Sequence, residues 1–144
     1  MRIDSYEDLE IWQLAMDLLV EVYRITVTLP DIERYNLIVQ MGKAAVSIPS
    51  NIAEGWGRGR SQSQAHFIKM SRGSLYELST QLEASRRLGY MTDTRASEMK
   101  VRTNELGKKI NAYLTWLEGT LVREDRHPYV SRADSDWPSD IPIH

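Results

Sequence analysis

Apolar residues recur at every third or fourth position over four long stretches of the chain, a spacing typical of amphipathic helices. Proline and glycine interrupt the pattern between these stretches. The expected helices span about residues 7–29, 32–56, 61–88 and 92–121. Short connections between consecutive helices favour antiparallel neighbours. The pattern therefore predicts an all-α fold, an antiparallel up-down-up-down four-helix bundle formed by residues 1–122.

Residues with strong local preferences mark the ends of these helices. Pro30 ends the first helix, because proline pushes the preceding residue out of the α region. Ser61 or Ser63 is suited to cap the third helix, and Thr92 or Asp93 to cap the fourth. The connections predicted in this way are short, as a bundle requires.

Pro49 lies inside the second expected helix, where it removes one backbone hydrogen bond and crowds the carbonyl four residues earlier. The apolar spacing continues in phase past it. We therefore expect a kink in the helix near Pro49 and no break in the chain. Ser47, Ser50 and Asn51 are close enough in sequence to satisfy the freed backbone groups.

The first helix carries two apolar stripes instead of one. The first stripe is Leu9, Trp12, Met16, Leu19, Tyr23 and Thr26, and the second is Ile11, Ala15, Leu18, Val22, Ile25 and Leu29. The stripes lie roughly 110° apart, whereas one bundle core needs an apolar arc of only about 100°. The excess predicts an oligomer whose interface is formed by Ile11, Leu18, Val22 and Ile25. The alternative is that a long aromatic side chain or the C-terminal tail covers the second stripe.

Length and composition add limits to this picture. A chain of 144 residues fits one domain, and its lack of cysteine excludes disulfides and thiolate metal sites. No N-terminal signal pattern and no apolar run of membrane-spanning length are present, so we expect a cytoplasmic protein with no membrane contact. Residues 123–144 hold three prolines among Ser and Asp, which predicts an extended tail that Tyr129 and Trp137 could pin to the surface.

Residues that could carry chemistry are scattered. His66, His127 and His144 follow no metal-ligand spacing, and no Gly-x-Ser-x-Gly elbow is present. Asn51 and Glu54 share one helix face just past Pro49, where they either satisfy the kinked backbone or make a functional contact. Two such residues without an acid, a base or a metal do not form an active site. We predict no catalytic residue, no metal and no cofactor.

The charges are segregated along the chain. Residues 1–33 carry a net charge of −6 and residues 34–91 a net charge of +5. Acidic and basic helices that complement each other explain this segregation, and so does a site for a polyanion. The candidate nucleic-acid-binding residues are Lys43, Arg58, Arg60, Lys69, Arg72, Tyr76, Arg86 and Arg87. Lysine and arginine contact phosphates and tyrosine stacks on unpaired bases, although Glu83 interrupts the basic stripe.

Four motifs resemble those of a known family: residues 8–13, 44–55, 72–78 and 88–90. The chain is similar over about residues 6–121 to the four-helix bundle proteins encoded in intervening sequences of bacterial 23S ribosomal RNA genes. The matching motif residues are Ser47, Pro49, Asn51, Glu54, Gly55, Gly73 and Ser74. Family members usually carry basic residues after the glutamine at position 40, whereas this chain has Met41-Gly42-Lys43.

The resemblance implies an antiparallel bundle that assembles as a homopentamer. It also implies kinship with the accessory variability protein of diversity-generating retroelements, a pentameric barrel that binds nucleic acid and a reverse transcriptase. Together with the basic stripe, it predicts a non-enzymatic oligomer that binds RNA or DNA. The alternative is a scaffold that binds another protein and has no nucleic-acid role.

Overall fold

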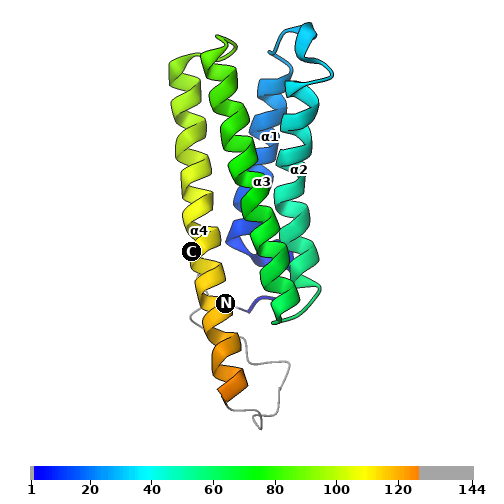
Figure 1. Ribbon diagram of the computed structural model, residues 1–144, viewed down its shortest axis with the longest axis vertical. Helices are drawn as coiled ribbons and strands as arrows, with labels where there is room; N and C mark the ends of the chain where they lie inside the picture. The colour runs from blue at the N-terminus through cyan, green and yellow to red at the C-terminus, as the bar shows by residue number, and fades with distance from the viewer. Residues whose placement is uncertain (1, 127–144) are drawn as a thin grey trace.

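The computed structural model describes residues 2–126, which form four α-helices and two 3₁₀ turns (Figure 1). The elements are η1 (Tyr6–Asp8), α1 (Glu10–Thr26), η2 (Asp31–Glu33), α2 (Leu37–Trp56), α3 (Gln62–Arg87) and α4 (Asp93–Arg126). The described residues contain no strand. The all-α prediction is confirmed.

The helices lie side by side along the long axis of the molecule, and α4 extends past the others at one end (Figure 1). Each helix contacts the next one along the chain, and α1 also contacts α4. This is the arrangement of an up-down bundle, as the short connections predicted. No described helix has an apolar stretch long enough to cross a membrane.

Four of the predicted helix ends are corrected. Helix α1 ends at Thr26 instead of about residue 29, and α2 begins at Leu37 instead of about residue 32, with the 3₁₀ turn η2 between them. The first helix begins at Glu10 because Ser5 and Asp8 form a capping box around η1 and Leu9 is extended, with ψ of 128°. The fourth helix runs to Arg126, so the predicted end of the bundle at residue 122 falls inside α4. The remaining residues of the predicted tail, with Tyr129 and Trp137, lie outside the described residues.

The ends of α3 follow the expected capping residues. The Ser61 hydroxyl accepts a hydrogen bond from the Gln64 amide at the start of the helix, at 3.1 Å. At its end Gly89 has a φ of +79°, and the Tyr90 amide donates to the Ser85 carbonyl, which together form a Schellman turn. Thr92 caps α4 by accepting from the Arg95 amide.

The core includes the stripe of α1 that was predicted to face another subunit. Ile11, Leu18, Val22 and Ile25 are each exposed by 3% or less within the single chain. The prediction that they form an oligomer interface is therefore wrong. The bundle core needs one apolar stripe from α1 and takes the purely aliphatic one, which leaves Tyr23 of the other stripe half exposed.

Helix α2 is continuous through Pro49, as predicted, and the bend itself stays a prediction. Side chains donate to three backbone carbonyls around the proline. The Ser50 hydroxyl reaches the Val46 carbonyl at 2.7 Å, and the Asn51 amide reaches the Ser47 carbonyl at 2.8 Å. From α3, the Ser71 hydroxyl donates to the Ile48 carbonyl at 2.9 Å. These bonds stabilise the helix where proline weakens its backbone ladder.

Candidate nucleic-acid interface

The basic stripe predicted on α3 lies beside α4. Lys69, Arg72 and Tyr76 follow each other at spacings of three and four, and Arg87 completes the predicted stripe about three turns further along α3. Two of them bind α4: Lys69 Nζ lies 3.0 Å from Glu118, and Arg72 Nη1 donates to Asn111 Oδ1 at 3.1 Å. Tyr76 stays 53% exposed. The ring of Tyr76 is therefore accessible next to a guanidinium that no carboxylate neutralises.

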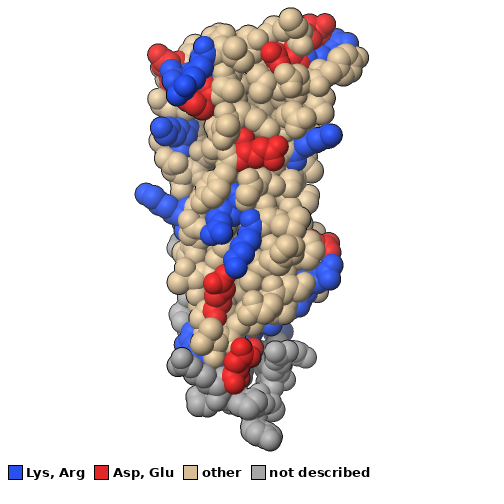
Figure 2. Space-filling view, viewed as in Figure 1, with Lys and Arg blue, Asp and Glu red and all other residues tan. Residues whose placement is uncertain are grey.

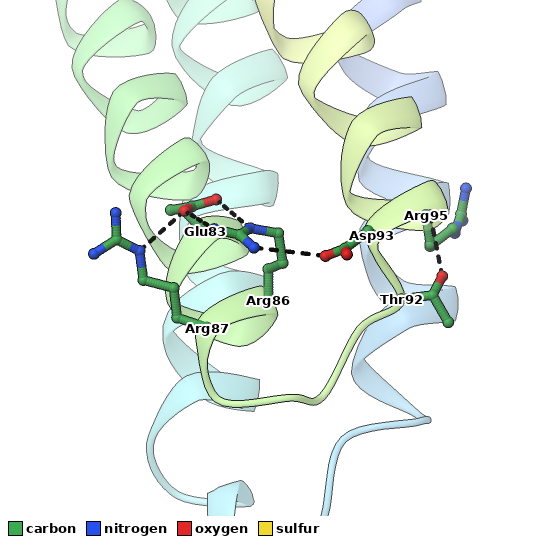
Figure 3. Close-up of polar contacts among 6 residues, drawn as sticks. All are labelled: Glu83, Arg86, Arg87, Thr92, Asp93 and Arg95. Atoms are coloured by element: carbon green, nitrogen blue, oxygen red, sulfur yellow. Dashed lines mark hydrogen bonds and ion pairs between the residues drawn. The ribbon is translucent and has the colours of Figure 1, made fainter.

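Arg86 and Arg87 lie at the end of the α3–α4 hairpin, where both bind the same carboxylate (Figure 3). Glu83 Oε1 accepts from Arg86 Nη2 at 2.7 Å and from Arg87 Nε at 3.0 Å. Arg86 also reaches across the hairpin toward Asp93, at 3.5 Å. The hydrogen bonds from the two arginines lower the pKa of Glu83 to about 2, so the carboxylate stays ionised. Glu83 thus neutralises part of the charge predicted for this end.

The remaining candidates do not join one surface. Arg58 pairs with Glu54 at 2.9 Å and lies over the Phe67 ring, 4.9 Å from its centroid. Arg60 lies 3.6 Å from Glu124 at the far end of α4. Lys43 is exposed on α2, beside α1, and therefore lies apart from the stripe on α3.

Five of the eight predicted residues thus form ion pairs within the chain: Arg58, Arg60, Lys69, Arg86 and Arg87. A paired cation contributes a weaker field to a polyanion than a free one does. The predicted set is too broad, and Arg72 with Tyr76 forms its accessible centre.

Helix α4 supplies residues that the sequence prediction missed. Lys100, Asn104, Lys108 and Asn111 are all exposed and recur every three or four positions on one face. Within residues 2–126, neither Lys100 nor Lys108 has an ion-pair partner. We call Arg72, Lys100 and Lys108 the cation row. Figure 2 shows blue side chains gathered over the middle of α3 and along α4 on this face.

A notch of about 440 Å³ continues the cation row toward the end of the hairpin. Its lining comes from both helices: Ser79, Leu82, Glu83, Arg86, Asp93, Ala96, Ser97, Lys100, Thr103 and Asn104. Lys100 belongs to both the notch and the cation row. Polar and charged groups thus follow the α3–α4 seam from the hairpin to the middle of the bundle.

The opposite seam, between α1 and α2, is apolar. Exposed apolar side chains lie along it and at its end: Tyr23 on α1, Val27, Ile32 and Tyr35 in the connection, and Val39 and Val46 on α2. We call these six residues the apolar seam. A groove of about 590 Å³ lies between the two helices, with Lys43 as its charged lining residue.

Three of the seven family-motif residues, Ser47, Gly55 and Ser74, lie at the contact between α2 and α3. The Ser47 and Ser74 hydroxyls share a hydrogen bond of 2.8 Å, and Asn51 donates to Ser47. A Cβ at Gly55 would lie 3.1 Å from the Cβ of Phe67, so glycine permits the close approach of α3. A Cβ at Gly73 would meet nothing within 4 Å. Among residues 2–126, no close contact therefore requires glycine at this position.

Metal-ligating side chains do not cluster within residues 2–126. His66 makes an edge-on contact with the Phe67 ring, at 5.7 Å between centroids. His127 and His144 lie outside the described residues.

Comparison with known proteins identifies the family. A family model described as 23S rRNA-intervening sequence protein matches residues 7–112, which is more than half of the chain. The chain belongs to this family. A search of curated proteins found no match.

Proposed function

We propose that this member of the 23S rRNA-intervening sequence protein family is a non-enzymatic homo-oligomer that binds RNA along the seam between α3 and α4. The observation that carries the proposal is the cation row. Lys100 and Lys108 are exposed and Arg72 is half-buried beside Asn111, and none of the three has a carboxylate partner among residues 2–126. Free cations in a row are suited to a phosphate backbone, because each contact releases condensed counterions.

The geometry of the row suits a strand of nucleic acid. Lys100 and Lys108 are eight residues apart on one face of α4, which corresponds to about 12 Å along the helix. Asn104 lies between the two lysines on this face and Asn111 lies one turn past Lys108. Tyr76 exposes its ring close to Arg72. Phosphate contacts would hold the strand, and the ring offers a surface on which an unpaired base can stack.

The apolar seam supports the oligomeric part of the proposal. Ile32 and Tyr35 are 84% and 86% exposed, which is unfavourable in water unless a second surface covers them. A second copy of the chain docked on this seam would bury them and leave the α3–α4 face open. A closed ring would repeat the cation row in every subunit and strengthen its field. The number of five subunits, and kinship with the retroelement accessory protein, stay predictions from the family resemblance.

Fluorescence anisotropy of a labelled, partly single-stranded RNA at several salt concentrations tests the RNA-binding part. Replacing Arg72, Lys100 and Lys108 by glutamine should lower the slope of log K against log salt by about 2. The control replaces Arg2, Arg24 and Arg34 by glutamine, which removes the same number of charges at exposed arginines that lie outside the α3–α4 face and pair with carboxylates. Equal losses in both triple variants, or no salt-dependent binding by the wild type, would refute the proposal.

The second candidate is a protein-interaction scaffold with no nucleic-acid role. The observation that favours it is that five of the seven predicted cations already form ion pairs within the chain. Under this alternative, Arg72→Glu with Arg87→Glu would remove a co-purifying protein without changing the mass of the oligomer. RNA affinity would then be the same in wild type and variant.

A further inference from the structure

The notch between α3 and α4 contains polar side chains that bond to nothing else in the described chain. Ser97, Lys100 and Asn104 follow each other at spacings of three and four on α4 and line the notch together. Within residues 2–126, their side chains have neither a hydrogen bond nor an ion pair. All three are exposed, so a ligand in the notch can reach their donors and acceptors.

The opposite wall is charged but internally compensated. Arg86 binds Glu83 through two nitrogen atoms, at 2.7 and 3.0 Å, and reaches Asp93 at 3.5 Å (Figure 3). Adding Lys100, the notch holds two cations and two carboxylates, so its lining is neutral overall. A neutral lining disfavours a group of high negative charge such as a phosphate. It suits a neutral group with several donors and acceptors.

The deeper part of the notch has an apolar surface. Leu82 is only 6% exposed, and Ala96 lines the notch from α4. The volume of about 440 Å³ falls within the range of small-molecule sites, about 300–1,000 Å³. A flat ring can pack on such a surface while its edge bonds to hydroxyl and amide groups.

We propose that this notch receives one unpaired nucleobase of the bound RNA. Its phosphates would lie on the cation row, which shares Lys100 with the notch. The Asn104 amide can donate and accept at a base edge, and Ser97 can add one bond. Proteins read RNA through bases that are splayed out of single strands. The inference rests on the proposed function and extends it, because it restricts the RNA to unpaired segments.

The first test compares the affinity of wild type and Ser97→Ala/Asn104→Ala for a single-stranded RNA and for a blunt RNA duplex of the same sequence. The double variant should bind the single strand about tenfold more weakly and the duplex within twofold of wild type. Its salt dependence should not change, because no charge is removed. Asn36→Ala, an exposed asparagine without a side-chain cap bond, is the matched control. Unchanged affinity for the single strand, or equal losses on both RNAs, would overturn the inference.

A second measurement tests the nucleobase site even if the protein does not bind the RNA strands of the first test. Backbone amide spectra are recorded while each of the four ribonucleoside monophosphates is added, with ribose 5-phosphate as the ligand that lacks a base. At least one nucleotide should produce saturable shifts at residues 79–86 and 93–104, and ribose 5-phosphate should not. Equal shifts with ribose 5-phosphate, or no shifts with any nucleotide, would eliminate the base site. The RNA-binding proposal is tested instead by the cation-row variants. A failure of the nucleobase site can therefore be distinguished from a failure of RNA binding.

Discussion

The two outer seams of this bundle differ in chemistry although the helices behind them share one core. The α1–α2 seam exposes six large apolar side chains, whereas the α3–α4 seam exposes lysines, an arginine and amides around the ring of Tyr76. Water solvates the polar seam at little cost. Exposure of the apolar seam to water is unfavourable, and its free-energy cost grows with the exposed apolar area. The α1–α2 face is therefore suited to contact with another protein surface, and the α3–α4 face to contact with a polyanion.

The two faces also differ in how they are held together. Ion pairs link α1 to α4, with Lys109 binding Glu10 at 2.7 Å and Arg95 binding Glu21. The hydrogen bond from Arg95 lowers the pKa of Glu21. These pairs occupy Arg95 and Lys109 on the flank of α4 that faces α1, whereas Lys100 and Lys108 on another flank have no ion-pair partner among residues 2–126.

The largest expected effect concerns which stripe of α1 faces the core. Leu18→Ala should lower the free energy of unfolding by about 2–5 kcal/mol, because a fully buried leucine leaves a cavity. Urea unfolding followed by circular dichroism measures the loss. Val20→Ala, at a position 44% exposed, should change stability by less than about 1 kcal/mol. If Leu18→Ala instead dissociates an oligomer of unchanged stability, the stripe assignment is wrong.

The next effect concerns the apolar seam itself. Tyr35→Glu with Val39→Glu should convert the oligomer to monomers at micromolar concentration, because the docked surface would have to bury two carboxylates. Mass photometry measures the subunit number, and circular dichroism should show an unchanged helix content. The control is Val101→Glu with Val122→Glu, two exposed valines on α4, which should leave the mass unchanged. A wild type that is already monomeric would contradict the assembly proposal.

The sequence was sufficient to predict the four helices, because strong periodicity and Pro30, Ser61 and Gly89 define them locally. The periodicity was insufficient to decide which α1 stripe is buried. Both stripes have helical spacing, and the choice depends on where α2 and α4 pack. A local signal did exist, because the buried stripe contains only aliphatic residues and alanine, whereas the other includes Tyr23 and Thr26.

The candidate site was predictable only in part, for a related reason. The pairs of Glu83 with Arg86 and Arg87 follow from spacings of three and four, and they could have been read from the sequence. The pair of Lys69 with Glu118 depends on the register of α4 against α3, which no local pattern contains. The cation row was missed because charge was summed over residues 34–91, and two of its members lie on α4.

Gly55 and Gly73 lie in opposite environments: a Cβ at Gly55 would press on α3, and a Cβ at Gly73 would have no neighbour within 4 Å. Gly55→Ala should destabilise the protein by about 1–2 kcal/mol, because its Cβ would press on the Phe67 Cβ and the Gln64 carbonyl. Gly73→Ala should stabilise it by up to about 1 kcal/mol, because nothing opposes a methyl group there and alanine favours the helix. Thermal unfolding of the two variants measures the difference.

Gly119→Ala, also without neighbours within 4 Å, is the control for the helix preference alone. It should stabilise the protein about as much as Gly73→Ala. A loss of stability in Gly73→Ala but not in Gly119→Ala would mean that a partner approaches α3 closely at Gly73 in the assembled protein.

The smallest effect concerns the charge balance at the end of the α3–α4 seam. Arg86 and Arg87 hold the pKa of Glu83 at about 2, below its ordinary value of 4.5. Because folding lowers this pKa, the stabilising contribution is complete above about pH 4.5 and is lost as the pH falls toward 2. Carbon NMR of the Glu83 carboxyl should give a midpoint near 2. The difference between wild type and Glu83→Gln in the urea concentration at half-unfolding should shrink over the same pH range. A titration midpoint near pH 4.5 for Glu83 would mean that the two arginines are free to bind phosphate without displacing Glu83.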